Sequence, residues 1–160
     1  MIEIPLTQGK SALIDDEDFE LVSKHKWYAE KSGDGRRWYA ATSIRTADGK
    51  KTTIKMHRYI KGITDRRIDC DHRDLNGLNN QKLNLRVCTR AQNMQNTPVK
   101  SNSSSGLKGI VLHKSSGLWG ARIRVNGKVK SLGYFYTPEG AHAAYCKAAA
   151  EHHGEFARTA

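Results

Sequence analysis

The sequence predicts an α+β protein made of two small modules, and three observations predict this class. Short alternating segments separated by hairpin turn signals fill residues 1–56. Two more alternating segments and a helix start follow between residues 67 and 96. A third group of alternating segments precedes one amphipathic helix after residue 106. Strands and helices are therefore segregated, as in an α+β fold.

The first module begins with a β-rich N-terminal lobe. Acidic residues crowd the first half of residues 15–24, which predicts a short helix with Phe19, Leu21 and Val22 buried. Gly and Asp at residues 33–35 and 48–49 predict hairpin turns. The expected strands of this lobe are residues 2–6, 11–14, 26–31, 37–44 and 51–56.

Four aromatic residues fall on the paired strands of this lobe. We favour the interpretation that they form its small core. The alternative is that they stack on bases or sugars of a nucleic acid. They are Trp27, Tyr28, Trp38 and Tyr39.

The stretch from residue 68 to residue 96 is the most informative about function. A strand predicted over residues 67–72 ends in the pair Asp71-His72, and a polar, turn-rich loop follows. Leu83, Leu85 and Val87 alternate with polar residues and predict a second strand with these three side chains buried. Thr89 with Gln92 three residues later predicts that a helix starts there. The unit is a strand, a loop, a strand and a helix.

The side chains of this unit indicate metal-assisted attack of water on a phosphodiester. Asp71 and Asn93 offer two oxygen ligands, which suit a hard cation that keeps several waters, such as Mg²⁺. His72 points to the other side of its strand from Asp71. A neutral imidazole near pH 7 is a suitable general base.

The order and spacing of these residues resemble the HNH endonucleases, whose fold is a ββα-metal unit. The resemblance implies that His72 deprotonates the attacking water. It implies that Asp71 and Asn93 hold one divalent metal, Mg²⁺ or Mn²⁺. Asn84 would be the middle Asn that braces the loop and orients the His, and Arg86 would contact the DNA backbone.

Two further features bear on this resemblance. An H-R pair also precedes the motif in HNH relatives, and here it is His57 with Arg58 in a short helix predicted over residues 56–61. His57 has two interpretations, contact with a DNA phosphate or bracing of the site. The chain has no paired C-x-x-C motif, so we expect no structural zinc.

A Ser/Asn/Gly-rich segment divides the chain into domains. Residues 98–106 are predicted to be a flexible linker. The first domain would be residues 1–97, with its nuclease core at 56–97, and the second would be residues 107–160. In the second domain we expect antiparallel strands at 108–113, 118–125 and 128–135, then a helix from Pro138 that ends at Gly154.

The second domain resembles the plant ethylene-response-factor (Apetala-type) DNA-binding domain. The similar segments are G-L-K-G-I, L-W-G-A-R-I-R-V, L-G-Y-F and T-P-E-G-A-H-A-A-Y. The resemblance puts Lys108 and Arg124 on basic DNA-contact positions, and strand parity puts Arg122 on the same sheet face as Arg124. Arg122 and Ser131 depart from the plant pattern, so the target sequence does not carry over.

Four other basic residues of this domain are candidates for DNA contacts. His113 and Lys114 are expected at the DNA backbone. Lys128 and Lys130 lie on the third strand, where a bulge would change which face they occupy.

The whole chain favours a polyanionic partner, because its net charge is +11 over 160 residues. We expect double-stranded DNA as the partner, no membrane association, no obligate protein partner and a monomer. Three unpaired cysteines and no signal-like N-terminus favour the cytoplasm, that of the host cell if the gene is of phage origin.

These observations predict a DNA endonuclease of the homing type, targeted by its second domain. Two alternatives stay open at this point. One is a sequence-specific DNA-binding regulator with an inactive nuclease lobe, and the other is a protein that binds structured RNA.

Overall fold

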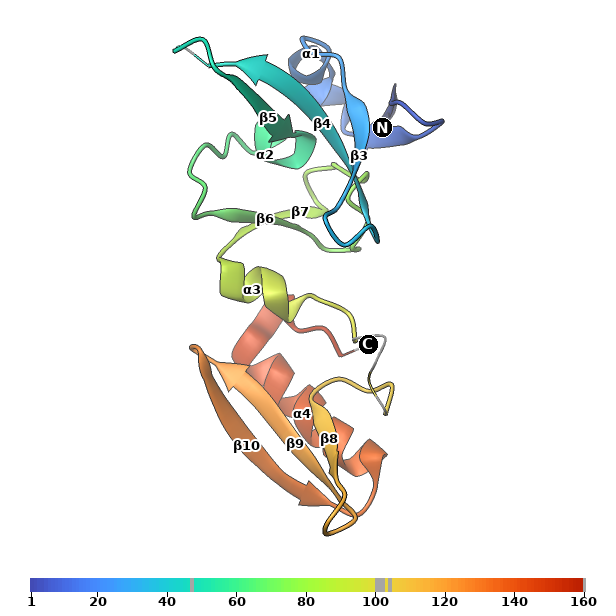
Figure 1. Ribbon diagram of the computed structural model, residues 1–160, viewed down its shortest axis with the longest axis vertical. Coiled ribbons are helices and arrows are strands. Elements are labelled where there is room, and N and C mark those ends of the chain that lie inside the picture. The colour runs from blue at the N-terminus through green and yellow to red at the C-terminus, as the bar shows by residue number, and fades with distance from the viewer. Residues whose placement is uncertain (47, 100–102, 104, 160) are drawn as a thin grey trace. The chain divides into compact units, whose positions relative to one another are not determined.

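The computed structural model describes residues 1–46, 48–99, 103 and 105–159. It confirms the α+β class, with small antiparallel sheets and few helices (Figure 1). The chain forms two compact units, Met1–Thr89 and Arg90–Ala160, which we name the N-terminal unit and the C-terminal unit.

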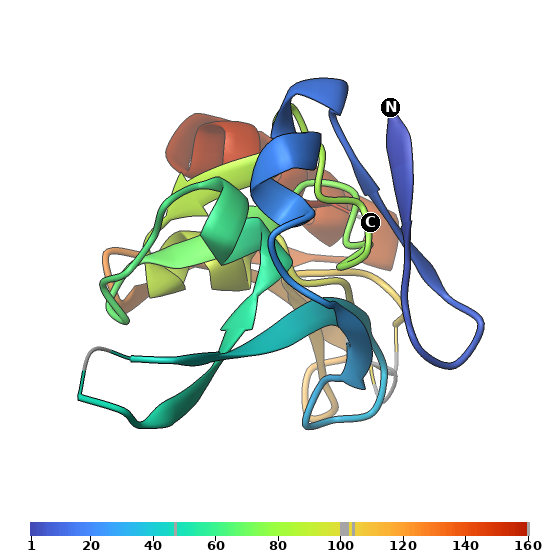
Figure 2. The same ribbon diagram turned by 90° about the horizontal axis from the view of Figure 1, so that it is seen from above.

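The N-terminal unit contains three separate sheets, β1–β2, β3–β4–β5 and β6–β7 (Figures 1 and 2). All of their strand pairs are antiparallel, and every strand predicted in this region is present. The strands are β1 (Ile2–Pro5), β2 (Ser11–Ile14), β3 (Tyr28–Lys31), β4 (Trp38–Arg45), β5 (Lys51–Lys55), β6 (Asp69–His72) and β7 (Leu85–Cys88).

The helices of this unit are short. They are η1 (Asp16–Asp18), α1 (Phe19–Val22) and α2 (Met56–Ile60). The helix predicted over residues 15–24 is one 3₁₀ turn followed by one α turn, and a single turn presents few side chains to the core. Val22 is buried, whereas the prediction that Phe19 is buried was wrong, because its side chain is 44% exposed.

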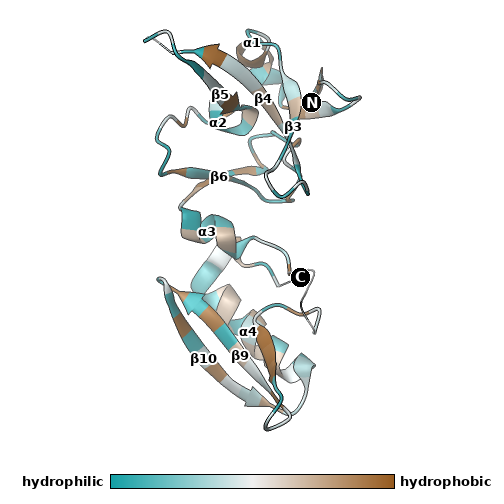
Figure 3. Cartoon of the chain, in the orientation of Figure 1, coloured by the Kyte–Doolittle hydropathy of each residue, from teal (hydrophilic) through white to brown (hydrophobic). Residues whose placement is uncertain are grey.

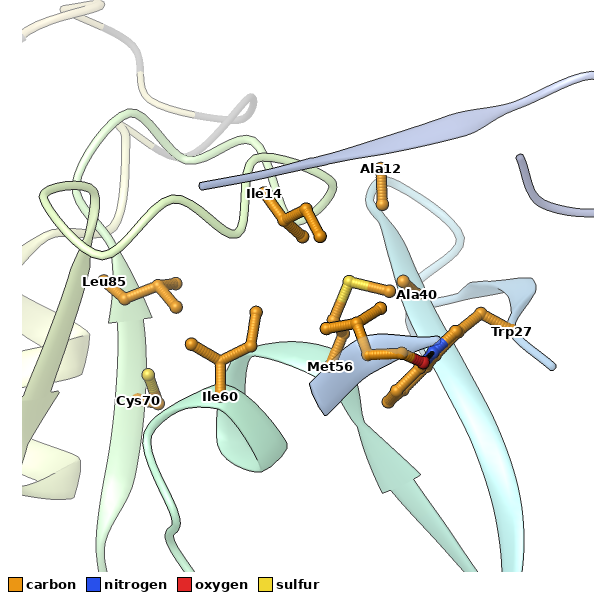
Figure 4. Close-up of a cluster of buried hydrophobic side chains, with 9 residues drawn as sticks. Ala12, Ile14, Trp27, Ala40, Met56, Ile60, Cys70 and Leu85 are labelled. Carbon is orange, nitrogen blue, oxygen red and sulfur yellow. Dashed lines mark hydrogen bonds between the residues drawn. The ribbon is translucent and has the colours of Figure 1, made fainter. Parts of the chain in front are cut away.

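One hydrophobic cluster joins these elements (Figure 4). It combines side chains of β2, α1, β4, α2, β6 and β7, so the sheet that carries the Asp-His pair is packed against the N-terminal lobe. Trp27 belongs to this cluster, and its indole Nε1 donates to the Val22 carbonyl at 2.8 Å. Tyr28, Trp38 and Tyr39 are half-buried outside it, so the core interpretation holds for Trp27. The cluster is Ala12, Ile14, Val22, Trp27, Ala40, Met56, Ile60, Cys70 and Leu85.

The burial pattern around β7 differs from the prediction. Leu85 is buried as expected, but Leu83 is 91% exposed and Val87 is 55% exposed. The polar neighbours Asn84 and Arg86 are buried instead, because each has a carboxylate partner inside the unit. Polar pairing therefore overrides the apolar alternation in this strand.

The C-terminal unit is a three-stranded sheet of order β10–β9–β8 with one long helix on one face (Figure 1). Ile123 of the sheet packs with Tyr145, Ala148 and Ala149 of that helix. The Thr137 hydroxyl caps the helix by accepting from the Gly140 amide at 3.1 Å. The elements are α3 (Arg90–Gln95), β8 (Ile110–His113), β9 (Leu118–Val125), β10 (Lys128–Phe135), α4 (Pro138–His153) and η2 (Gly154–Phe156).

The helix α3 groups with the C-terminal unit, whereas the sequence placed residues 90–97 with the first domain. Contacts of Lys108 explain this grouping. Its ammonium donates to the carbonyls of Gln95 and Thr97, at 2.6 and 2.7 Å, just where α3 ends. In the predicted linker, residues 100–102 and 104 lie outside the described residues.

Candidate active site

The first candidate site lies on the β6–β7 hairpin. The antiparallel register sets Asp71 opposite Arg86 and His72 opposite Leu85. Opposite residues share a face of the hairpin, so Asp71 and Arg86 meet and form an ion pair. Both side chains are buried, with residue exposures of 4% and 6%.

This placement changes the interpretation of Arg86. The resemblance to HNH endonucleases implied that Arg86 contacts the DNA backbone, which requires an accessible guanidinium. The structure instead puts the Arg86 side chain inside the unit and against the Asp71 carboxylate. Its positive charge offsets the cost of burying that carboxylate.

His72 is buried, and its Nε2 atom lies near a side-chain oxygen of the loop. Its Nε2 lies 3.4 Å from Oδ1 of Asn80, whose own amide donates to the Leu78 carbonyl at 3.1 Å. Because a carbonyl only accepts, this second bond fixes the Asn80 amide with its oxygen toward His72. A hydrogen bond from Nε2 to this oxygen requires the tautomer with its proton on Nε2, which leaves the lone pair of the neutral ring on Nδ1.

The protonation state of His72 also follows from its surroundings. Burial lowers the pKa of His72 below its usual 6.5, and the hydrogen bond to Asn80 opposes this shift. A lowered pKa keeps the ring neutral at pH 7, which is the form that accepts a proton. The folded protein therefore holds the His72 ring in its neutral form at pH 7.

Asn84 braces the loop between β6 and β7. Its amide donates to an Asp74 carboxylate oxygen at 2.9 Å and to the Asn79 carbonyl at 2.8 Å, and its own oxygen accepts from the Asp74 amide at 3.0 Å. Its side chain is thus occupied by the loop. The hydrogen bond that orients His72 comes from Asn80 and not from Asn84, which corrects that part of the sequence prediction.

The β1–β2 hairpin holds the same loop from the other side. The backbone N–H of Leu13 in β2 donates to the Leu78 carbonyl, and the Leu13 carbonyl accepts from the backbone N–H of Asn80, both at 2.8 Å. Asp15 accepts from the Lys82 amide at 2.7 Å. The N-terminal hairpin thereby fixes Asn80, which in turn contacts His72. Sequence reasoning missed Asn80 because it is one of many Asn residues in a turn-rich loop.

The two residues predicted to hold metal lie on different units. Asp71 is on β6 in the N-terminal unit, and Asn93 is on α3 in the C-terminal unit. Their pairing therefore rests on the sequence pattern. Among the described residues, no group of three or more His, Cys, Asp or Glu side chains is arranged to hold a metal ion.

The second candidate site is the sheet face that points away from α4, which we name the outer face. Along β9, Ala121 and Ile123 are buried toward α4, whereas Arg122 and Arg124 are exposed on the outer face, as predicted. Figure 3 shows this alternation of apolar and polar residues on β9. The register pairs Ser131 with Arg122.

The register also places the two lysines of β10. Lys128 pairs with Val125 and Lys130 pairs with Ile123, so both share the face that α4 covers, at its exposed margin. A register shift between Ser131 and Gly133 lies beyond them and leaves this parity unchanged. The sequence left the face of these two lysines open, and the register puts them on the face opposite Arg122 and Arg124.

The other basic candidates of this unit differ in their surroundings. Lys108 is held by carbonyls at the C-terminal end of α3, so its ammonium is not presented on the outer face, and burial lowers its pKa to about 8. His113 is on the outer face, where its ring lies edge-on to Tyr134 with centroids 4.9 Å apart. Lys114 is exposed in the turn that follows β8.

Comparison with known proteins decides the family. Over 155 residues the chain is 32% identical to a protein of Acanthamoeba polyphaga mimivirus named as an uncharacterized HNH endonuclease, L560. The match covers 94% of this chain and 74% of that protein. The chain belongs to the HNH endonuclease family. No family model matches this HNH protein, and no solved structure matches it.

The helices of this HNH protein were also compared with the length and apolarity that a membrane-spanning helix needs. In the part of the chain that the structure describes, none is both long enough and apolar enough to cross a membrane.

Burial of His57 gives this HNH protein a testable pH dependence. His57 is 8% exposed, and burial, with the nearby His72, holds its pKa well below 6.5. As the pH falls, the His57 imidazole is therefore protonated in the unfolded chain before it is protonated in the folded protein. The free energy of unfolding decreases as pH falls from about 6.5 toward the lower pKa of folded His57. The slope attributable to His57 is at most about 1.4 kcal/mol per pH unit.

Urea unfolding at pH 7.5 and pH 5.5 would measure this effect. We expect His57→Phe to lose less stability than the wild type between the two pH values. An equal loss in both proteins would mean that His57 does not stay neutral in the folded state.

Proposed function

We propose that this chain is a DNA endonuclease of the homing type that hydrolyses a phosphodiester, with His72 as general base. The observation that carries the proposal is the buried His72, kept neutral by burial and oriented by Asn80, next to the buried Asp71. Membership of the HNH endonuclease family supports the same reaction.

Each residue then has a defined role. His72 Nδ1 takes the proton of the attacking water, while Nε2 stays bound to Asn80. Asn84 and the β1–β2 hairpin keep the loop in place around this ring. Arg86 forms an ion pair with the Asp71 carboxylate inside the unit.

One divalent metal, Mg²⁺ or Mn²⁺, completes the proposed site, held by Asp71 and Asn93. The donor set fits this ion, because carboxylate and amide oxygens are the hard ligands that it prefers. When bound, such an ion supplies positive charge to the reacting phosphate. Arg86 would then share the Asp71 carboxylate with the metal. We propose no structural zinc.

We further propose that β6, β7 and α3 form the ββα-metal unit and that residues 107–160 are an ethylene-response-factor-like DNA-binding module. The element order and the helix-backed three-stranded sheet support this proposal. Arg122 and Arg124 on the outer face would read guanine edges, with His113 and Lys114 at the backbone. Partner DNA would be double-stranded.

The proposed function is tested by incubating supercoiled DNA with the protein in Mg²⁺ and in EDTA. We expect nicked or linear product with Mg²⁺ and none with EDTA. Binding of the DNA without any cutting would favour the regulator with an inactive nuclease lobe. Stronger competition by structured RNA than by duplex DNA would favour an RNA-binding function.

Removing the side-chain oxygen of Asn80 should disturb the orientation of His72 while leaving the His72 imidazole in place. We expect Asn80→Leu to lower kcat about 10- to 100-fold, by analogy with partners that orient metal-binding histidines. Its control is Leu83→Ala, because Leu83 is 91% exposed in the same loop region. Unchanged kcat in Asn80→Leu would show that the contact with His72 has no part in the reaction.

A further inference from the structure

We propose that His57 and Tyr39 are positioning residues that hold the His72 ring in the orientation needed by a base. The inference rests on the proposed role of His72. It assigns His57 to bracing the site rather than to contact with a phosphate, and it gives Tyr39 a role in the nuclease unit.

Three aromatic rings from three different elements meet in the N-terminal unit. The His57 ring of α2 lies edge-on to the His72 ring of β6, with centroids 4.8 Å apart and planes at 79°. Tyr39 of β4 contacts both, with centroids 5.7 Å from His57 and 6.0 Å from His72. Edge-to-face and tilted pairs of this kind are the favoured aromatic geometries.

Neighbouring rings are needed to orient His72, because its side-chain torsion χ2 is weakly restricted by itself. Rotation of an imidazole about χ2 is broad and roughly two-fold. A half-turn would exchange Nδ1 with a carbon and remove the lone pair from its place. The hydrogen bond to Asn80 is 3.4 Å long, which is near the limit for such bonds. Rings packed beside the imidazole oppose this rotation.

The position of His57 is set by the residue that follows it. Arg58 donates to the carbonyls of Asp65 and Ile68, at 2.8 and 2.6 Å, and so ties α2 to the segment that enters β6. The Nδ1 atom of His57 is buried, and no described residue forms a hydrogen bond with it. His57 therefore acts on His72 through the packing of its ring and not through a hydrogen bond from Nδ1.

Tyr39 is held between the active-site loop and β5. At Gly77 a Cβ would lie 2.4 Å from the Trp38 carbonyl and 2.6 Å from the Tyr39 ring, so the loop backbone packs directly on β4. On β5, the ammonium of Lys55 lies 5.2 Å from the Tyr39 ring centroid. The Tyr39 ring thus links the loop to the two histidines.

The test compares His57→Ala, which removes the ring, with His57→Phe, which keeps a ring of similar shape. Ile60→Ala is the matched control, because Ile60 is a buried residue of the same helix whose side chain belongs to the hydrophobic cluster. Single-turnover cleavage, DNA affinity, unfolding in urea and the NMR signals of the His72 ring are measured for each protein.

We expect His57→Ala to lower the cleavage rate about 10- to 100-fold with unchanged DNA affinity. His57→Phe should recover most of this rate, and Ile60→Ala should lose stability without a comparable loss of rate. The His72 ring signal should broaden or double in His57→Ala and stay single in His57→Phe.

Three results would overturn the proposal. Weaker DNA affinity with an unchanged cleavage rate in His57→Ala would make His57 a DNA contact. An equal loss of rate in Ile60→Ala would reduce its role to folding. Unchanged His72 signals in His57→Ala would remove the positioning role. Since the NMR signals need no activity, a wild type that does not cut would refute the nuclease function separately.

Discussion

Replacing Arg86 with methionine is expected to lower the free energy of unfolding by about 3–5 kcal/mol, the usual cost of breaking a buried ion pair. The substitution keeps much of the side-chain volume and removes the cation beside Asp71, whose residue exposure is 4%. Urea unfolding at pH 7 measures the change.

A surface ion pair of the same unit provides the control. Arg67 pairs with Asp65 through two nitrogens, but the Arg67 side chain is 91% exposed. Arg67→Met is therefore expected to change stability far less than Arg86→Met does. The double variant Asp71→Asn with Arg86→Met should regain part of the stability lost in Arg86→Met. Equal small effects of the two arginine substitutions would contradict the structural role given to Arg86.

Removing both outer-face arginines is expected to weaken site-specific DNA binding by about 1–3 kcal/mol for each lost base contact. Arg122→Ala with Arg124→Ala acts on exposed side chains, so the fold should be kept. Affinity for the target and for unrelated duplex is compared at one salt concentration, since phosphate contacts depend on salt.

The control is the pair Lys128→Ala with Lys130→Ala, which removes the same charge from the other face of the sheet. We expect this pair to weaken binding to all duplexes alike, through the general electrostatic attraction. A loss of discrimination as large as that of the arginine pair would contradict the assignment of DNA reading to the outer face.

Local signals in the sequence were enough to place most elements. The Asn126-Gly127 turn and the alternation on both sides of it predicted two of the strands of the second sheet, and both are present. The apolar parity of β9 also predicted that Arg122 and Arg124 share the exposed face. These features depend on residues close together in the chain.

The features that could not be predicted depend on distant contacts. Asn80 is fixed by Leu13, and Arg86 is turned inward by Asp71 across a strand pair. Lys108 could be placed only once α3 was seen to end beside it. None of these pairings leaves a periodic pattern. The family resemblances therefore placed Arg86 and Lys108 at DNA, and the turn-rich composition of the loop left Asn80 as a turn residue.

The most direct test of the account is the cleavage rate of the wild type and of His72→Ala on DNA that both proteins bind. Single-turnover reactions on supercoiled DNA with Mg²⁺ separate the chemical step from binding. We predict that His72→Ala binds this DNA as the wild type does and cuts it about 10²- to 10⁴-fold more slowly, the range for loss of a general base. Cutting at the wild-type rate by His72→Ala would contradict the account and place the base elsewhere.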